Sequence, residues 1–229
     1  MSSVTSSMVL TIAILGGTGH EGAGLALRWA AAGYKVIIGS RTPEKATMAA
    51  TELNAALGLD VITGADNVSA AHRADIVVMT VPFSAHAATL ETVKDAVQGK
   101  VFVDVTVPLV PPKVSTVQLP AEGAAAVIAQ RILGPDVRVV SAFQNIAAEH
   151  LSDLSRVHID CDVLVSGDDE EAREQVVQLA KAAGMQAWHA GPLANAVVAE
   201  ALTSVLISLN KRYKVKNSGI RLTGLPRDL

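Results

Sequence analysis

Three glycines with the spacing of a phosphate-binding turn follow an apolar run near the start of the chain. Residues 9–15 form the run, and Gly17, Gly19 and Gly22 come after it in the order Gly-x-Gly-x-x-Gly. The bare backbone of such a turn can approach a pyrophosphate, and the free N–H groups of the following helix point at its charge. Glycine-rich turns also serve packing alone, but the preceding strand and the next motif indicate a dinucleotide here.

The next motif indicates which dinucleotide is bound. An acidic residue about 20 positions after the glycines would hold a free ribose 2′-hydroxyl, but this chain has Ser40 and Arg41 at the end of its second predicted strand. A hydroxyl and a guanidinium suit a 2′-phosphate, so NADP is favoured over NAD. Lys45 lies within one helical turn of Arg41 and either completes a cationic clamp on this phosphate or is a solvated lysine.

Two residues inside the turn are unusual for a phosphate site. Glu21 stands at a helix start, where the dipole favours a carboxylate, yet its charge would repel a pyrophosphate held by the same helix end. We therefore expect its side chain to point away from the phosphates. His20 and His150 are equally compatible with lining the site and with a surface or packing position. We expect surface or packing positions for the other histidines, His72, His86, His158 and His189.

The spacing of reactive residues indicates neither a metal site nor a dedicated acid–base catalyst. No metal-type cluster, Ser-His-Asp arrangement, carboxylate pair or nucleophilic cysteine is evident. Alcohol and hydroxyacid dehydrogenases need a lysine, histidine or tyrosine to move the hydroxyl proton. Related hydroxyacid dehydrogenases keep a lysine near the start of the long helix of their substrate domain. The corresponding region of this chain, residues 191–195, contains no lysine.

Composition limits the function classes. The 229 residues include 22 acidic and 19 basic side chains, and a net charge of −3 argues against general binding to nucleic acids or membrane surfaces. Because the lone Cys161 cannot form an internal disulfide, we expect a reducing compartment. Residues 1–7 lack the regions of a signal peptide, and no apolar run reaches the about 18 residues of a membrane span. The composition favours a cytoplasmic enzyme.

The C-terminal end is basic although the chain is acidic overall. From residue 211 onward, one acid, Asp228, stands against six basic residues: Lys211, Arg212, Lys214, Lys216, Arg221 and Arg227. These residues either complement the dipole of a helix end or bind a second anionic ligand.

Alternating strands and helices position the candidate residues. We predict strands over residues 9–15, 34–39, 61–63, 74–81, 101–107 and 137–143, and helices over residues 24–32, 42–57, 84–97 and 121–133. This alternation is typical of a Rossmann-type, doubly wound parallel sheet of the α/β class, which binds ligands at the carboxyl ends of its strands. Ser40, Val81 and Val107 fall at such ends.

Shorter elements follow the sixth strand. We predict helices over residues 147–154, 170–183 and 194–213, and strands over residues 163–166 and 185–190. The change suggests an NADP-binding Rossmann domain, residues 1–140, and a smaller C-terminal α/β domain, residues 141–229. The apolar stripe of the last helix is either core or the seam of a homodimer.

Short motifs occur in a characteristic order between about residues 9 and 225. They are Gly16-Gly17-Thr18-Gly19, Gly39-Ser40-Arg41, Thr80-Val81-Pro82, Val140-Ser141-Ala142, Gly167-Asp168-Asp169, Ala190-Gly191-Pro192-Leu193 and Gly219-Ile220-Arg221. In this combination the chain resembles the NADPH-dependent reductases of coenzyme F420, an 8-hydroxy-5-deazaflavin.

The resemblance implies hydride transfer between C4 of the nicotinamide and C5 of the deazaflavin. NADP would lie along the strand ends, and the deazaflavin would lie in a cleft against the smaller domain. The family's deazaflavin-contacting position corresponds to Ser218, and its NADP-contacting positions correspond to Thr18, Gly19, His20, Glu21, Ser40, Arg41, Lys45, Val81, Val107 and Ala148. A deazaflavin accepts a hydride at carbon, so two rings held roughly 3 to 3.5 Å apart need no proton shuttle.

We expect Val81, Pro82, Val107 and Ala148 to shape the nicotinamide pocket, and the anionic tail of F420 would give the basic C-terminus a ligand. The chain departs from family members at His20-Glu21, Phe83 and Gln144, which bears on ring stacking and on the preferred direction. Two alternatives are an NADP-dependent reductase of a small imine or carbonyl compound, which the missing proton donor disfavours, and a non-catalytic NADP(H) sensor.

Overall fold

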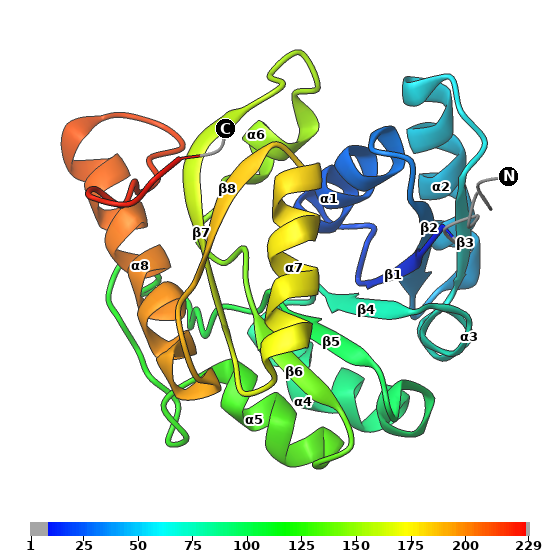
Figure 1. Cartoon of the computed structure of the whole chain (residues 1–229), viewed down its shortest axis with the longest axis horizontal. Coiled ribbons are helices and arrows are strands. Elements are labelled where there is room, and N and C mark those ends of the chain that lie inside the picture. Colours follow the sequence, from blue (N-terminus) through cyan, green and yellow to red (C-terminus); the bar gives the residue numbers. More distant parts are fainter. Residues whose placement is uncertain (1–8, 228–229) are drawn as a thin grey trace, which may run out of the picture.

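The computed structural model describes residues 9–227, which fold around one eight-stranded sheet (Figure 1). Its first six strands are β1 (Thr11–Leu15), β2 (Lys35–Ser40), β3 (Ile62–Asp66), β4 (Ile76–Met79), β5 (Val101–Asp104) and β6 (Arg138–Ser141). They are parallel and lie in the order β3-β2-β1-β4-β5-β6, which confirms the predicted doubly wound sheet. Residues 1–7, which the sequence distinguishes from a signal peptide, lie outside the described residues.

Two further strands extend the sheet beyond β6. β7 (Ile159–Gly167) runs antiparallel to β6, and β8 (Met185–His189) runs parallel to β7. The pairing of β6 with β7 involves only Val140 and Ser141 on the β6 side. The division of the chain near residue 141 stays a prediction, and it would concern two units that share one sheet.

Helices cover both faces of the sheet, and buried side chains alternate between the two faces. In β1, Ile12 and Ile14 pack in one core cluster with residues of α1, α2 and α7, whereas Ala13 and Leu15 pack in a second cluster with residues of α3, α4 and α5. The helical elements are α1 (His20–Ala31), α2 (Pro43–Leu57), α3 (Asn67–Arg73), α4 (Phe83–Val93), η1 (Lys94–Val97), α5 (Ala125–Leu133), α6 (Ala148–Ser152), α7 (Glu170–Ala182), η2 (Leu193–Asn195) and α8 (Ala196–Tyr213). Burial on both faces explains why β1 is apolar throughout its core.

The helices α1 and α3 differ from the sequence prediction. α1 begins at His20 rather than at residue 24. The later start was predicted because glycine disfavours helix interiors, whereas Gly22 and Gly24 both lie inside this helix. α3 was absent from the prediction, since seven residues are too few to show a helical period. Its start is set locally, because the Asp66 carboxylate accepts a hydrogen bond from the Ser69 N–H at 2.9 Å.

A buried acid joins α8 to α5. Glu200 is 1% exposed and accepts hydrogen bonds from the N–H groups of Ala125 and Ala126, at 2.6 and 3.1 Å. This cap explains why α5 begins at Ala125 rather than at residue 121 as predicted. By length and composition alone the stretch Leu193–Tyr213 could cross a membrane, and its most apolar 18-residue window has a mean hydropathy of 1.5 and is 33% buried. An acid bonded to a neighbouring helix instead suits a helix packed on one side against the protein core.

Arg28 of α1 ties the segment around α6 to the rest of the fold. The side chain is 6% exposed, and its guanidinium donates hydrogen bonds of 2.7 to 2.9 Å to four carbonyl groups, those of His150, Leu151, Asp153 and Arg156. A longer bond, 3.4 Å, reaches the Ala183 carbonyl. One side chain therefore holds residues 150–156 of the connection between β6 and β7 against α1.

We expect Arg28→Met to lower the free energy of unfolding by about 3 kcal/mol, because five backbone carbonyl groups lose a charged donor. Denaturant unfolding followed by circular dichroism measures this loss. Arg156→Met is the control, since the Arg156 side chain is 56% exposed and pairs with Asp153 at the surface. The control should lose less than about 1 kcal/mol, and equal losses would contradict the role given to Arg28.

Candidate functional site

The glycine turn joins β1 to α1 and leaves the start of α1 open. Gly19 is the N-cap residue, no side chain caps the helix, and the first helical hydrogen bond runs from Ala23 N–H to Gly19 O at 2.9 Å. A Cβ on Gly22 would lie 2.6 Å from Thr80 Oγ1 and 2.7 Å from Gly17 Cα, so only glycine lets α1 sit this close to the end of β4. The uncapped N–H groups at this helix start are therefore free to bind a phosphate group.

A cavity of about 290 Å³, here named the turn cavity, opens at this helix start. It brings together seven of the predicted NADP-contacting residues, Thr18, Gly19, His20, Glu21, Ser40, Arg41 and Val81. Ser40 ends β2 and its hydroxyl accepts from the Thr42 N–H at 3.2 Å, while Arg41 is exposed at the rim. The glycine turn and the Ser-Arg pair, far apart in sequence, thus line one space.

Asn67 is a lining residue that the sequence analysis missed. It is 7% exposed, stands at the first position of α3, and its Oδ1 atom is buried without a hydrogen-bond partner among the described residues. Lys45 does not line the turn cavity but lies exposed in the first turn of α2. The cationic clamp by Lys45 therefore stays a prediction.

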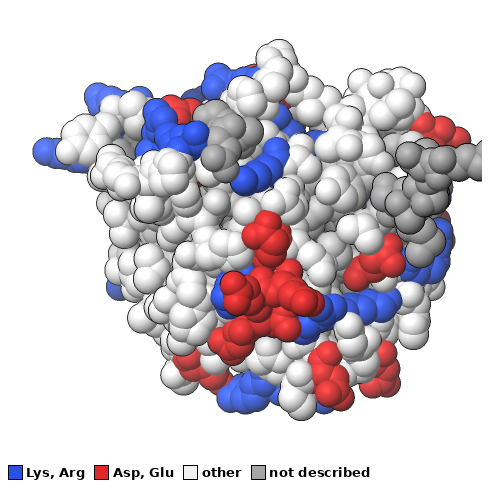
Figure 2. Space-filling view, viewed as in Figure 1, with Lys and Arg blue, Asp and Glu red and all other residues white. Residues whose placement is uncertain are grey.

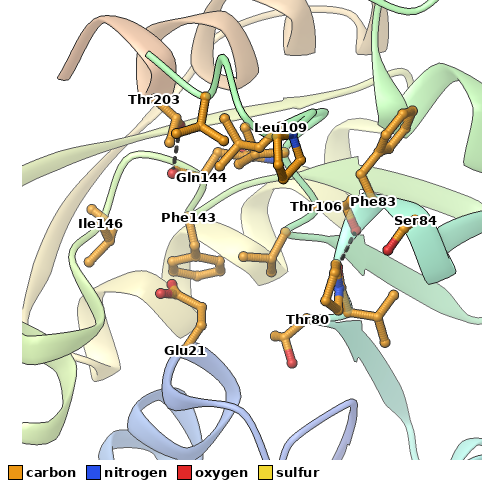
Figure 3. Close-up of a pocket in the computed structure, with 16 residues that line it drawn as sticks. Glu21, Thr80, Phe83, Ser84, Thr106, Leu109, Phe143, Gln144, Ile146 and Thr203 are labelled. Carbon is orange, nitrogen blue, oxygen red and sulfur yellow. Dashed lines mark hydrogen bonds between the residues drawn. The ribbon is translucent and has the colours of Figure 1, made fainter. Parts of the chain in front are cut away.

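A second cavity of about 560 Å³, here named the ring cavity, continues from the first (Figure 3). The two share Glu21, Thr80, Val81 and Pro82. The other lining residues follow β4, β5 and β6 or come from α8, and most are apolar: Phe83, Ser84, Val105, Thr106, Val107, Leu109, Pro111, Val114, Phe143, Gln144, Ile146 and Thr203. Of the residues predicted to shape the nicotinamide pocket, Val81, Pro82 and Val107 line this cavity, whereas Ala148 lines neither cavity and starts α6 just beyond Ile146.

Gln144 presents a fixed acceptor at the wall of the ring cavity. Its Nε2 donates to Asp104 O and to Ser141 Oγ, both at 2.8 Å. Because a carbonyl oxygen can only accept, the amide must be oriented this way, and Oε1 is left buried with no partner among the described residues. The Thr203 hydroxyl donates to the Gln144 carbonyl at 2.8 Å and fixes the backbone (Figure 3).

The residue before Gln144 is held in an unusual backbone conformation. Phe143 has φ of 75°, in the left-handed region, which costs a bulky residue of order 1 kcal/mol or more. Its ring is fully buried and meets the Trp29 ring edge-on at 5.8 Å between centroids. Strained residues of this kind concentrate at functional sites, and this one forms the wall opposite Glu21 (Figure 3).

A buried pair supports the end of β5 behind the ring cavity. His86 Nε2 lies 2.7 Å from Asp104 Oδ2, with side chains 1% and 0% exposed, and Asp104 Oδ1 accepts from the Thr106 N–H at 2.9 Å. The prediction of a surface or packing role for His86 did not foresee this partner. The pair orients the backbone that carries Thr106 and Val107 into the cavity.

Glu21 is the one titratable residue that lines the ring cavity within the described part of the chain. Its carboxyl group points from the start of α1 toward Phe143 (Figure 3). The Oε1 atom is buried without a hydrogen-bond partner, and burial raises the pKa of Glu21 to about 8. Residues 9–227 contain no group of three or more His, Cys, Asp or Glu side chains that could hold a metal ion.

Ser218 lies in a small side pocket of about 120 Å³ beside the ring cavity. The two share Gln144, Ile146 and Thr203, so the predicted deazaflavin position adjoins the predicted nicotinamide residues. The Ser218 hydroxyl is buried and has no hydrogen-bond partner among the described residues.

The basic C-terminus divides into structural and exposed residues. Arg227 pairs with the buried Asp162 carboxylate, which also accepts from Leu222 N–H at 2.7 Å, and Arg221 pairs with Asp160 at 3.2 Å. These two arginines therefore hold the C-terminal segment on β7. The remaining residues, Lys211, Arg212, Lys214 and Lys216, are exposed near the end of α8, whereas acidic side chains gather over α7 in Figure 2.

Comparison with known proteins agrees with this architecture. Residues 11–108 match the sequence model of the family described as "NADP oxidoreductase coenzyme F420-dependent". An F420-dependent NADP reductase from Methanothermobacter thermautotrophicus is 46% identical over 227 residues, 96% of this chain and 97% of that protein. One from Methanocaldococcus jannaschii is 41% identical, over 94% of this chain and 99% of that protein.

A solved structure shows the same fold. The crystal structure of an Arthrobacter sp. FB24 protein, assigned as an F420-dependent NADP-reductase, superposes with a TM-score of 0.77 at 26% identity. The match covers 93% of this chain and 99% of that chain. High identity over almost the full length, together with the matching fold, leads to one conclusion: this chain belongs to the family of coenzyme F420-dependent NADP oxidoreductases.

Proposed function

We propose that the protein transfers a hydride between NADP(H) and coenzyme F420. The continuity of the turn cavity and the ring cavity carries the proposal, because a dinucleotide with its phosphates at the turn would extend its nicotinamide end past Val81 into the second space. The ring cavity has the size of small-molecule sites and follows the strand ends, where doubly wound sheets bind ligands.

The residues of the turn cavity fit NADP. The open start of α1 suits the pyrophosphate, and no side chain lies within 4 Å of the position that a Cβ on Gly19 would take. Ser40 and Arg41 would bind the 2′-phosphate, and Lys45 would approach it from the first turn of α2. His20, Thr18 and Gly19 would surround the phosphates, as the family resemblance implies.

The ring cavity supports catalysis by positioning. We infer that Val81, Pro82 and Val107 contact the nicotinamide, with Ala148 near its edge, and that the deazaflavin lies toward Gln144 and Ser218. When bound, the two cofactors supply a hydride donor and a hydride acceptor at carbon, which needs no proton shuttle. The exposed lysines at the end of α8 would attract the anionic tail of F420.

Glu21 favours a second candidate function. On sequence alone, an NADP-dependent imine or carbonyl reductase is disfavoured because no proton donor is evident. A carboxyl group with a pKa of about 8 in the ring cavity is such a donor at neutral pH. Activity on a small cyclic imine must therefore be measured beside activity on F420.

Location and assembly stay predictions. We propose a cytoplasmic homodimer, and the exposed apolar side chains of Val198, Val205 and Leu209 on α8 support pairing of two copies. Sedimentation velocity at several protein concentrations measures the assembly.

Rapid mixing of the purified protein with NADPH and F420 tests the proposed reaction. We expect loss of the deazaflavin absorbance band together with NADPH oxidation in a one-to-one ratio, and much slower transfer from NADH. NADPH oxidation by a cyclic imine but not by F420 would favour the second candidate. Tight NADPH binding without transfer to any acceptor would instead favour a sensor.

We expect Arg41→Ala to raise KM for NADPH about 10- to 100-fold and to leave KM for NADH nearly unchanged, because only NADPH carries the 2′-phosphate. Steady-state kinetics with both cofactors checks this. Arg73→Ala, which removes an exposed arginine at the far end of α3, is the control and should change neither KM. Equal effects of Arg41→Ala on both cofactors would remove the 2′-phosphate assignment.

Ser218→Ala tests the deazaflavin end. Because the Ser218 hydroxyl has no partner within the described chain, its loss should not lower the melting temperature. We expect KM for F420 to rise about 3- to 10-fold, the value of one hydrogen bond, while KM for NADPH stays the same. An unchanged KM for F420 would place the deazaflavin elsewhere.

A further inference from the structure

The Glu21 carboxyl group lies where the turn cavity and the ring cavity meet, and one of its oxygens lacks a hydrogen-bond donor within the described residues. Both cavities include Glu21 in their walls, and Oε1 is buried without a hydrogen-bond donor within the described residues. An ionised carboxylate with a buried oxygen that no donor reaches is unfavourable, and a carboxyl group in such a place takes up a proton instead. Burial accordingly raises its pKa to about 8.

No neighbouring charge compensates Glu21. None of the other residues that line the ring cavity with Glu21 carries a charged side chain. In the turn cavity the ionisable residues beside Glu21 are His20, which precedes it on α1, and Arg41. Both side chains are exposed.

The remaining ionisable neighbours belong to α6, which packs on α1. There the Glu149 carboxylate accepts from Asn217 Nδ2 at 2.6 Å, and His150 Nε2 lies 3.3 Å from Asn217 O. Both α6 side chains are therefore engaged with the C-terminal segment rather than with Glu21.

A neutral acid removes the conflict at the start of α1. An ionised Glu21 would repel the pyrophosphate that the same helix end attracts, whereas a protonated one carries no charge and gains an O–H donor. We propose that Glu21 binds NADPH in its neutral acid form and donates a hydrogen bond to an uncharged oxygen on the nicotinamide half of the cofactor. This inference rests on the proposed binding of NADPH across the two cavities.

The sign of the pH dependence follows from the neutral form. Well below pH 8 Glu21 is almost fully protonated, so NADPH binds with little proton change at this residue. Above about pH 8 Glu21 is mostly ionised in the free protein. The phosphates of bound NADPH raise the pKa of Glu21 further, so binding is accompanied by uptake of a proton. Affinity then falls with pH, toward about tenfold per pH unit.

Titration of NADPH into wild-type protein and into Glu21→Gln, between pH 7.5 and 9.5, tests the proposal. Glutamine keeps the size and a donor but cannot ionise. We expect similar Kd values at pH 7.5, a steep rise of Kd for the wild type above pH 8, and a much flatter profile for Glu21→Gln. The control Glu149→Gln alters an exposed acid on α6 and should keep the wild-type profile.

Calorimetry in buffers of different ionisation enthalpy counts the proton directly. At pH 8.5 the wild type should take up a large fraction of one proton per NADPH bound, and Glu21→Gln should take up much less. Glu21→Leu lacks a donor, so its Kd should be about 5- to 10-fold above that of Glu21→Gln at every pH. Equal proton uptake in wild type and Glu21→Gln would overturn the neutral-acid state, and equal Kd values for the leucine and glutamine variants would overturn the donor role.

Protein stability separates this inference from the proposed function. Because the folded-state pKa is raised above the ordinary 4.5, stability linked to Glu21 is present at low pH and is lost as pH rises from about 5 to 8. The melting temperature of the wild type should therefore fall relative to Glu21→Gln across this range without any cofactor. If that fall occurs but NADPH does not bind, the proposed function fails while the neutral acid stands; if it does not occur, the inference fails whatever the activity.

Discussion

The close seating of α1 on the sheet is the constraint on which the site depends. A Cβ at Gly22 would lie 2.6 Å from Thr80 Oγ1, and one at Gly24 would lie 2.5 Å from Leu151 Cβ, so the helix rests directly on the end of β4 and on α6. This seating aims the open N–H groups of α1 at the turn cavity. It also places Glu21 against the ring cavity, so the first turn of α1 lines both halves of the site.

Local patterns predicted the parts of the fold that local physics determines. The parallel strands and the glycine turn were predictable because burial on both faces requires apolar runs and close approach requires glycine. The start of α5 was not, because its cap, Glu200, comes from 75 residues further along the chain. Nor could the sequence show that Asp162 engages Arg227, or that the Asp104 carbonyl orients Gln144, since each pairing exists only after the sheet has assembled.

Two acids whose pKa values are both raised show how a structural group differs from one directed at a ligand. Burial raises the pKa of both Glu21 and Glu200 to about 8. The Glu200 oxygens accept from the first N–H groups of α5, so its hydrogen bonds are complete within the fold. Glu21 keeps an oxygen without a donor at a cavity wall. The hydrogen-bond partners of the two acids, rather than their pKa values, therefore distinguish Glu21 as the one free to bind a ligand.

Catalysis by positioning requires that the walls of the ring cavity hold their places. Hydride transfer between two rings depends on a near-attack separation, and a misplacement of about 1 Å can cost of order 100-fold in rate. The left-handed Phe143 persists because Trp29 meets its ring edge-on and is itself tied by a 2.9 Å bond from its indole N–H to the Leu179 carbonyl. The strain at Phe143 is thus sustained by the core beneath α1, and the same helix that seats the phosphates also supports the wall on which the rings would rest.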